Sequence, residues 1–196
     1  MRLSMRKARV FLLSATFLWV LAGRCLATSS PVDVEHSTLT VQVFKKGLFS
    51  GFAHDHQIAA PLSSGIVDPA APSVEVHFDT RKLKVLDPDA SVSDRAKIQE
   101  TMLSDKVLDA GHFTEIVFVS RNVKVAGENT YAVEGDLTLH GVTHPLVLAV
   151  SLRNGHYTGS VNVKQTDFGI TPISLVGGSV KVKDVVEITF DIVLAK

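Results

Sequence analysis

Apolar residues recur at every second position through most of the chain from Thr38 onward, and this pattern restricts the fold more than any other feature. In residues 74–79, VEVHFD, three apolar side chains alternate with Glu, His and Asp. Successive side chains of a strand point to opposite faces, so this alternation predicts strands with one apolar face. Eight segments fit the pattern: residues 39–44, 58–67, 74–79, 115–123, 131–139, 146–152, 157–164 and 186–194.

Turn-forming residues separate these segments, at 68–72, 126–129, 140–145, 154–155 and 176–178. The pair Asn154-Gly155 is a strong signal for a two-residue hairpin turn, because both residues tolerate positive φ. Hairpin connections make neighbouring strands antiparallel. About eight such strands are enough to close a small barrel that holds side chains or one small ligand. We therefore expect an all-β fold, a closed antiparallel barrel of about eight strands.

Residues 91–108, SVSDRAKIQETMLSDKVL, break the alternation. Ser91 or Ser93 can cap a helix, Asp94 is an acid suited to its first turn, and the apolar residues that follow have roughly helical spacing. We expect one helix here that covers an end of the barrel. No internal repeat or second domain is indicated.

The N-terminus has the layout of a secretory signal peptide. Four basic residues precede the apolar run VFLLSATFLWVLAG, and the small-residue exit Cys25-Leu26-Ala27 follows it. This run is shorter than the roughly 20 residues that span a bilayer, so we expect no stable membrane anchor. We predict a signal peptide over residues 1–27 with cleavage after Ala27, a flexible segment over 28–36, and a barrel domain over 37–196 in the periplasm or outside the cell.

Cleavage after Ala27 changes both the cysteine content and the charge of the protein. It would remove Cys25, the only cysteine, and with it any thiol nucleophile or disulfide. The chain has 20 basic and 20 acidic residues, but residues 1–27 hold five of the basic ones and no acid. The remaining domain is therefore about five charges negative and shows no basic run, so we expect no nucleic-acid partner.

Four segments of the chain resemble the YceI-like proteins in order and spacing. They are MLSDKVLDAGHFTEIVFVS (102–120), LTLHGVTHPLVLAV (137–150), DFGI (167–170) and VKDVVEITFDIVLA (182–195). The resemblance implies a lipocalin-like antiparallel barrel with a central channel. It also implies an isoprenoid quinone, a polyisoprenoid or a fatty amphiphile as the ligand, and it allows a homodimer, as in some members of the family.

Two departures from the family pattern stand out. Phe113 occupies a position where the family usually has proline. Residues 50–56, SGFAHDH, replace a Gly-x-Phe pattern and place polar groups near one opening of the barrel.

Apolar positions on the strand faces and just beyond the strand ends are the candidates for a ligand channel. Aromatic side chains supply much contact area in such sites. An alternative remains open, since apolar strand faces can equally fill a barrel with their own side chains. The predicted channel residues are Phe44, Phe49, Phe52, Phe78, Leu103, Phe113, Phe118, Leu137, Leu139, Phe168 and Ile170.

His54, His56 and His140 are the candidates for the mouth of the channel or for contact with a polar head group. His54 and His56 are two positions apart, so on a strand they face the same side and could reach one metal ion. A metal-binding or redox-partner module is therefore the alternative function. We expect no enzyme and no cofactor, because no serine of the chain lies in a recognised nucleophile motif.

Overall fold

The computed structural model of the chain describes residues 29–46, 55–175 and 180–195. The predicted signal peptide and the candidate residues Phe49, Phe52 and His54 lie outside the described residues. So does the turn predicted over 176–178.

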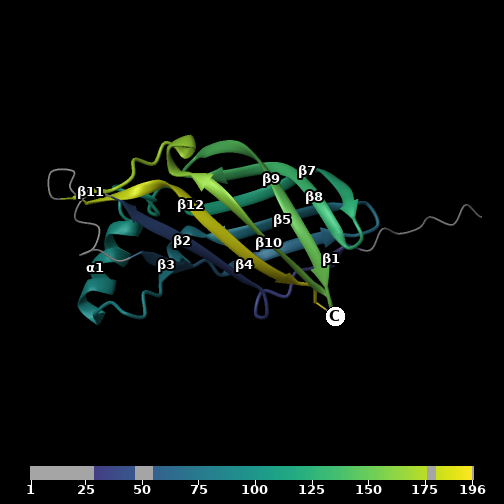
Figure 1. Cartoon of the computed structure of the whole chain (residues 1–196), viewed down its shortest axis with the longest axis horizontal. Coiled ribbons are helices and arrows are strands. Elements are labelled where there is room, and N and C mark those ends of the chain that lie inside the picture. Colours follow the sequence, from purple (N-terminus) through teal and green to yellow (C-terminus); the bar gives the residue numbers. More distant parts are fainter. Residues whose placement is uncertain (1–28, 47–54, 176–179, 196) are drawn as a thin grey trace, which may run out of the picture.

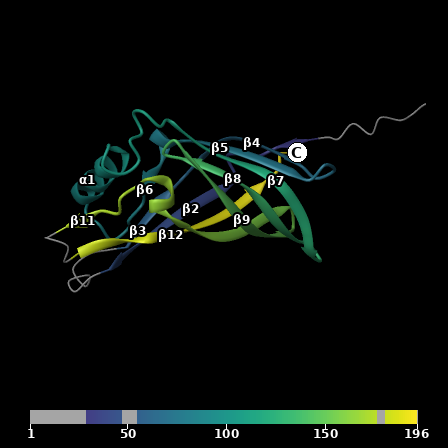
Figure 2. The same ribbon diagram turned by 90° about the horizontal axis from the view of Figure 1, so that it is seen from above.

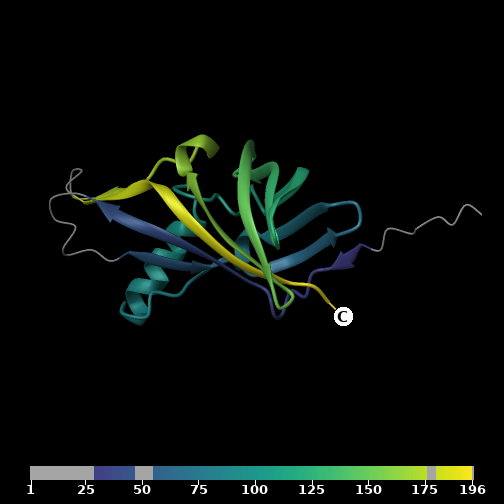
Figure 3. The same ribbon diagram turned by 45° about the vertical axis from the view of Figure 1, so that its right-hand side comes forward.

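A single antiparallel sheet curls into a half-barrel, with one α-helix at one of its ends (Figure 1). Seen from the side, the long strands cross one another as the sheet wraps around its interior (Figure 3). The order of strands in the sheet is β1-β4-β5-β7-β8-β9-β10-β12-β2-β3-β6, with β11 paired to β12. The strands are β1 (Ser30–Pro31), β2 (Thr38–Lys46), β3 (His56–Ala59), β4 (Leu62–Asp68), β5 (Ser73–Asp79), β6 (Lys84–Val85), β7 (Glu115–Gly127), β8 (Thr130–Leu139), β9 (Val142–Arg153), β10 (His156–Lys164), β11 (Ser174–Leu175) and β12 (Val180–Val193).

The expected all-β fold with one helix is confirmed, and each of the eight predicted segments forms strand. The described part of the sheet has twelve strands, however, rather than about eight. Its strand order begins at β1 and ends at β6, and the sheet forms a half-barrel. The segment 58–67 divides into β3 and β4 around Pro61, which has no N–H to donate to a ladder. As a result β3 pairs with β2 and β4 pairs with β5. Three further strands, β1, β6 and β11, are two residues long, too short to show alternation.

Residues 30–33 join the two sides of the half-barrel at one end. β1 pairs with β4, and Val32 forms an isolated bridge with Leu194, just beyond β12. The Asp33 N–H donates to the Val193 carbonyl at 2.8 Å, and Val32 is buried in the core. The structure thus gives defined partners to part of segment 28–36, which the sequence analysis predicts to be flexible.

Two-residue turns connect the central strands. Asn154 and Gly155 both have positive φ, 52° and 84°, as the sequence predicts for the β9–β10 hairpin. The turn expected over 140–145 is confined to His140 and Gly141, with φ of 53° and 73°, because Val142 already pairs with Leu139. The β7–β8 and β9–β10 hairpins therefore turn at one end of the sheet, and the β8–β9 hairpin turns at the other.

Helix α1 (Val92–Leu103) is shorter than the predicted 91–108 segment. Ser91 is its N-cap and accepts a hydrogen bond from the Asp94 N–H at 3.1 Å. The helix lies at the end of the sheet that also carries β6 and β11, as the view from above shows (Figure 2). Two 3-10 turns, η2 (Thr80–Lys82) and η3 (Gln165–Phe168), complete the regular elements. None of the helices in the described ranges has the length and hydrophobicity needed to cross a membrane.

Candidate functional site

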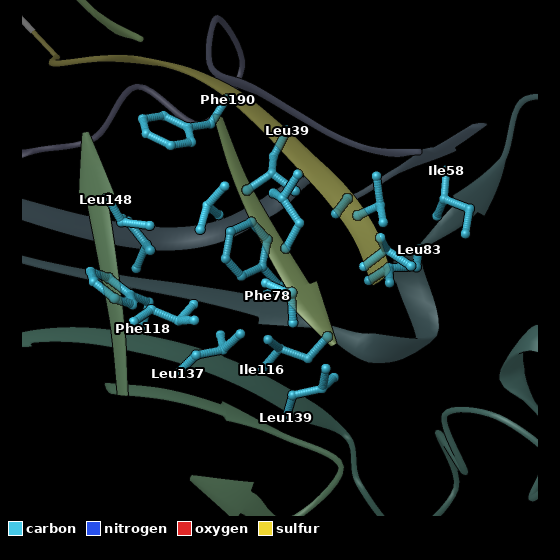
Figure 4. Close-up of a pocket in the computed structure, with 18 of the residues that line it drawn as sticks. Leu39, Ile58, Phe78, Leu83, Ile116, Phe118, Leu137, Leu139, Leu148 and Phe190 are labelled. Carbon is cyan, nitrogen blue, oxygen red and sulfur yellow. The ribbon is translucent and has the colours of Figure 1, made fainter. Parts of the chain in front are cut away.

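The inner face of the sheet and α1 enclose a cavity of about 520 Å³. This volume lies within the roughly 300–1,000 Å³ typical of small-molecule sites. Because side chains alternate along each strand, the same apolar positions that define the strands in the sequence meet here (Figure 4). Its apolar wall includes Leu39, Val41 and Val43 of β2, Val74, Val76 and Phe78 of β5, Ile116 and Phe118 of β7, Val133, Leu137 and Leu139 of β8, Leu146, Leu148 and Val150 of β9, Val161 and Val163 of β10, and Val186, Ile188, Phe190 and Ile192 of β12.

Two glycines on the inner face give room to aromatic rings of the wall. A Cβ atom at Gly135 would lie 2.5 Å from Cζ of Phe118, and one at Gly159 would lie 2.6 Å from Cζ of Phe190. Each ring therefore approaches the backbone of a neighbouring strand at its glycine. Any larger residue at either glycine would have to displace the ring, and it would also meet a backbone carbonyl oxygen, that of Val119 at Gly135 and that of Ala149 at Gly159.

Five of the predicted channel residues line this cavity: Phe78, Phe118, Leu137, Leu139 and Ile170. Four of them come from adjacent strands, β5, β7 and β8, and Ile170 follows η3. Their contact with a ligand stays a prediction, but their position in the wall follows directly from the period-two pattern.

Four other predicted channel residues lie elsewhere. Leu39, Val41 and Val43 face the cavity, so Phe44 takes the opposite face of β2, where Lys183 Nζ lies 5.3 Å from its ring centroid. Alternation along β2 thus places Val43, rather than the aromatic residue beside it, in the wall.

The remaining three of these four residues pack around the end of the sheet near α1, outside the cavity wall. Phe168 is completely buried, with its ring centroid 5.8 Å from that of His144. The Phe113 ring lies 4.5 Å from the ring of His140, and Leu103 packs against the core from the last residue of α1.

His56 is the candidate mouth residue that reaches the cavity. It begins β3, lines the cavity near α1, and its Nδ1 lies 2.6 Å from Oδ2 of the buried Asp87. The other carboxylate oxygen of Asp87 accepts a hydrogen bond from the Gln57 N–H at 2.8 Å. A carboxylate only accepts hydrogen bonds, so Nδ1 of His56 is the donor to Asp87, and Nε2 has no hydrogen-bond partner among the described residues.

Polar side chains gather around His56 at this end of the cavity. Lys97 and Thr101 of α1 and Gln165 of η3 also line it. Lys97 is largely exposed and lies 3.6 Å from Asp94. This end therefore combines an apolar interior with groups that can bind an anionic or oxygen-bearing head.

His140 does not line the cavity. Its Nδ1 lies 3.2 Å from the carbonyl oxygen of Phe168, and its ring packs on Phe113. These contacts attach the β8–β9 turn to the residues that follow α1 and to η3. The structure therefore assigns His140 a packing position, whereas the sequence analysis places it with the mouth residues.

Sequence reasoning missed Tyr131 and Tyr157, which line the cavity at the end away from α1. They are the only two tyrosines of the chain. Burial raises the pKa of the Tyr157 phenol above its ordinary value, and the neighbouring Tyr131 adds to this effect. The available signal was their position, since each is the second residue after a predicted hairpin turn and shares the apolar face of its strand.

The alternative function, a metal-binding module, needs a cluster of ligands. Among the described residues, no three His, Cys, Asp or Glu side chains are arranged to hold an ion. His56 is held by Asp87, and His54 lies outside the described part of the chain.

Comparisons with known proteins give one family. A family model described as a YceI-like domain matches residues 31–194. A UPF0312 protein of Pseudomonas fluorescens is 38% identical over 166 residues, which cover 76% of this chain and 79% of that protein. A UPF0312 protein of Pseudomonas savastanoi is 29% identical over 162 residues, which cover 76% of this chain and 80% of the relative.

Solved structures share the fold at lower identity. BcnA of Burkholderia cenocepacia superposes with a TM-score of 0.62 at 21% identity, covering 84% of this chain and 99% of BcnA. The YCEI protein of Campylobacter jejuni gives a TM-score of 0.50 at 15% identity, covering 79% of this chain and 85% of that one. At these identities the likeness shows the fold alone.

Proposed function

The chain belongs to the YceI-like family, and from this premise we propose that it binds an isoprenoid-type or other long-chain amphiphilic lipid in the cavity of its curled sheet. The observation that carries the proposal is the cavity itself, about 520 Å³ with an apolar wall and polar groups at its end near α1. A barrel filled by its own side chains would not leave this space.

The energetics favour a long apolar tail. Burying three isoprene units, about fifteen carbons at roughly 0.8 kcal/mol each, would gain about 12 kcal/mol. Association costs of roughly 4 to 15 kcal/mol offset much of that gain. A short chain would therefore bind weakly and a longer one usefully.

His56 is the group best placed to meet the polar head. Asp87 fixes the orientation of its ring, and Nε2 is the nitrogen that remains for the ligand. As a neutral ring His56 accepts a hydrogen bond from a hydroxyl, and as an imidazolium it donates one to a carbonyl, carboxylate or phosphate oxygen. Lys97 adds a positive charge at the same end of the cavity.

We further propose that the protein acts as a carrier or binding protein without catalysis, in the periplasm or outside the cell. The signal-peptide pattern of residues 1–27 supports this location. An apolar wall without a partnered nucleophile suits binding rather than bond breaking.

The test is native mass spectrometry of the mature protein, purified from the secreted fraction without detergent, followed by extraction and identification of the bound molecule. A species with a long apolar tail is the expected result. A bare polypeptide that also fails to bind added long-chain lipid would overturn the proposal. Stoichiometric metal without lipid, lost in His54→Ala/His56→Ala, would favour the metal-binding module.

Two adjacent residues of β9 provide a matched pair of variants for this experiment. Leu148 lines the cavity, whereas Val147 is 65% exposed on the opposite face. Leu148→Gln places an amide in the apolar wall and should reduce the amount of retained lipid several-fold. Val147→Gln should retain lipid like the unmodified protein, and thermal melting of both variants shows that each is folded.

A further inference from the structure

Tyr131 and Tyr157 form a second polar position in the cavity wall, at the end away from α1. Tyr131 is the second residue of β8 and Tyr157 the second residue of β10. The β7–β8 and β9–β10 hairpins turn at the same end of the sheet, so both tyrosines are placed there. Val150 of β9 pairs with Tyr131 on one side and with Gly159 on the other, two residues from the Tyr157–Leu152 pair.

This end is well separated from His56. The register runs from His56 to Val43, from Val43 to Val186, and from Val186 to Val163 of β10. Tyr157 is six positions before Val163 on the same strand. At about 3.3 Å per residue, the two ends of the cavity are roughly 20 Å apart along β10.

The two phenol groups are available to a ligand. Neither hydroxyl has a hydrogen-bond partner within residues 29–46, 55–175 and 180–195, and neither is among the fully buried polar atoms that lack one, so both keep some accessible surface. Val133, Val150, Val161 and Ile192 of the wall are apolar and offer none, and the polar lining residues Asp68 and Ser73 make no hydrogen bond to either hydroxyl. Phenylalanine would fill the same space, so the hydroxyls are not needed for packing. Burial keeps the Tyr157 phenol protonated, because it raises the pKa above the ordinary value near 10.

We propose that the Tyr131 and Tyr157 hydroxyls form a second subsite, which binds an oxygen function at the far end of the ligand chain. The inference rests on the proposed function and deepens it. The cavity then takes a chain with polar groups at both ends, one held by His56 and Lys97 and the other by the two tyrosines. The span of roughly 20 Å matches an extended chain of about sixteen carbons, at about 1.3 Å of advance per bond of about 1.5 Å.

Two probes of equal chain length test the subsite. Palmitate has a carboxylate at one end only, and ω-hydroxypalmitate adds a hydroxyl at the other. Both are titrated into the delipidated mature protein by calorimetry, alongside the Tyr131→Phe/Tyr157→Phe variant. An apolar wall alone would penalise the added hydroxyl, because a buried hydroxyl without a partner is costly.

We expect the unmodified protein to bind ω-hydroxypalmitate at least as tightly as palmitate. In the double variant, ω-hydroxypalmitate should bind about ten-fold more weakly, with palmitate unchanged. An equal affinity loss for both probes, or an unchanged ratio between them, would overturn the subsite and leave the proposed function standing. Failure of the unmodified protein to bind either probe would overturn the subsite, and the proposed function falls with it when an isoprenoid lipid also fails to bind.

Discussion

The ring of Phe118 on β7 lies directly over Gly135 on β8, so close that a Cβ atom at Gly135 would be 2.5 Å from Cζ of the ring. The same Cβ would be 2.5 Å from the carbonyl oxygen of Val119. Gly135 therefore sets both the spacing of the backbone and the position of the ring. Phe118 in turn forms part of the cavity wall.

Gly135→Ala should both destabilise the protein and narrow the cavity. The added methyl meets a backbone oxygen as well as a ring, and overpacking of this kind costs about 1–3 kcal/mol. Phe118 lines the cavity, so we expect a displaced ring to narrow it and retained lipid to fall too. Urea unfolding and lipid quantification measure the two effects. Gly111→Ala is the control, because a Cβ there meets nothing within 4 Å; equal behaviour of the two variants would contradict this account of Gly135.

The main strands and their turns could be predicted from the sequence, because alternation and positive-φ turn residues are local signals. Asn154-Gly155 forms the hairpin that it predicts. Strands β1 and β6 could not be predicted, because their pairing depends on partners far along the chain, whereas the break at Pro61 had a local signal that the sequence analysis did not use. Residues 30–33, for example, pair with β4 and with residues near Leu194.

The sequence predicts residues of the cavity wall, but, apart from His56, it does not predict the polar groups at the two ends of the cavity. Phe78, Phe118, Leu137 and Leu139 follow from the period-two pattern. The partner of His56 is 31 residues away in the chain, so no local pattern indicates that Asp87 orients the ring. Whether the apolar faces would fill the interior or leave a cavity also depends on the curvature of the whole sheet, which no local pattern encodes.

Asp87 should contribute to stability mainly through the groups that it satisfies. Asp87→Ala leaves the Gln57 N–H and the His56 Nδ1–H without their acceptor, and we expect a loss of about 2 kcal/mol in the free energy of unfolding. Asp89→Ala makes the same change at an exposed position two residues away, and should stay within about 0.5 kcal/mol of the unmodified protein. Urea denaturation of both variants tests this; a similar small effect in each would show that Asp87 is dispensable for folding.

His77 should make stability depend on pH. Its Nε2 lies 2.7 Å from Glu75 Oε1 and its Nδ1 lies 2.9 Å from Glu115 Oε1, and these two carboxylates raise the pKa of His77. The protonated ring stabilises the folded state, because its pKa is higher there than in the unfolded chain. This stabilisation is complete when the pH is below the unfolded pKa of about 6.5, and it disappears as the pH rises through the folded pKa. The ring is partly exposed, so solvent screening limits the effect to about 1 kcal/mol or less.

The measurement compares the unmodified protein with His77→Gln at about pH 5.5 and about pH 8.5, on either side of the expected titration. The difference in unfolding free energy should be larger at the lower pH. The variant Glu75→Gln/Glu115→Gln tests whether the two carboxylates cause the shift. In this variant the pKa of His77, measured by NMR titration, should return toward its ordinary value. A pH-independent difference between His77→Gln and the unmodified protein would count against the carboxylate bridge.

We expect the buried hydroxyl of Thr80 to weaken the fold. Its Oγ1 has no hydrogen-bond partner among the described residues, although the side chain is almost completely buried next to the end of β5. Thr80→Val removes this unsatisfied group at nearly constant shape, so we expect the free energy of unfolding to rise by about 1 kcal/mol. Thr166→Val is the control with the opposite expectation, because the Thr166 hydroxyl donates to Asp184 Oδ2 at 2.8 Å. The free energy of unfolding of that variant should fall by about 0.5–1 kcal/mol, so parallel urea denaturation of the two variants should give changes of opposite sign. A loss of stability in Thr80→Val comparable to that in Thr166→Val would mean that the Thr80 hydroxyl is satisfied, for example by a buried water molecule.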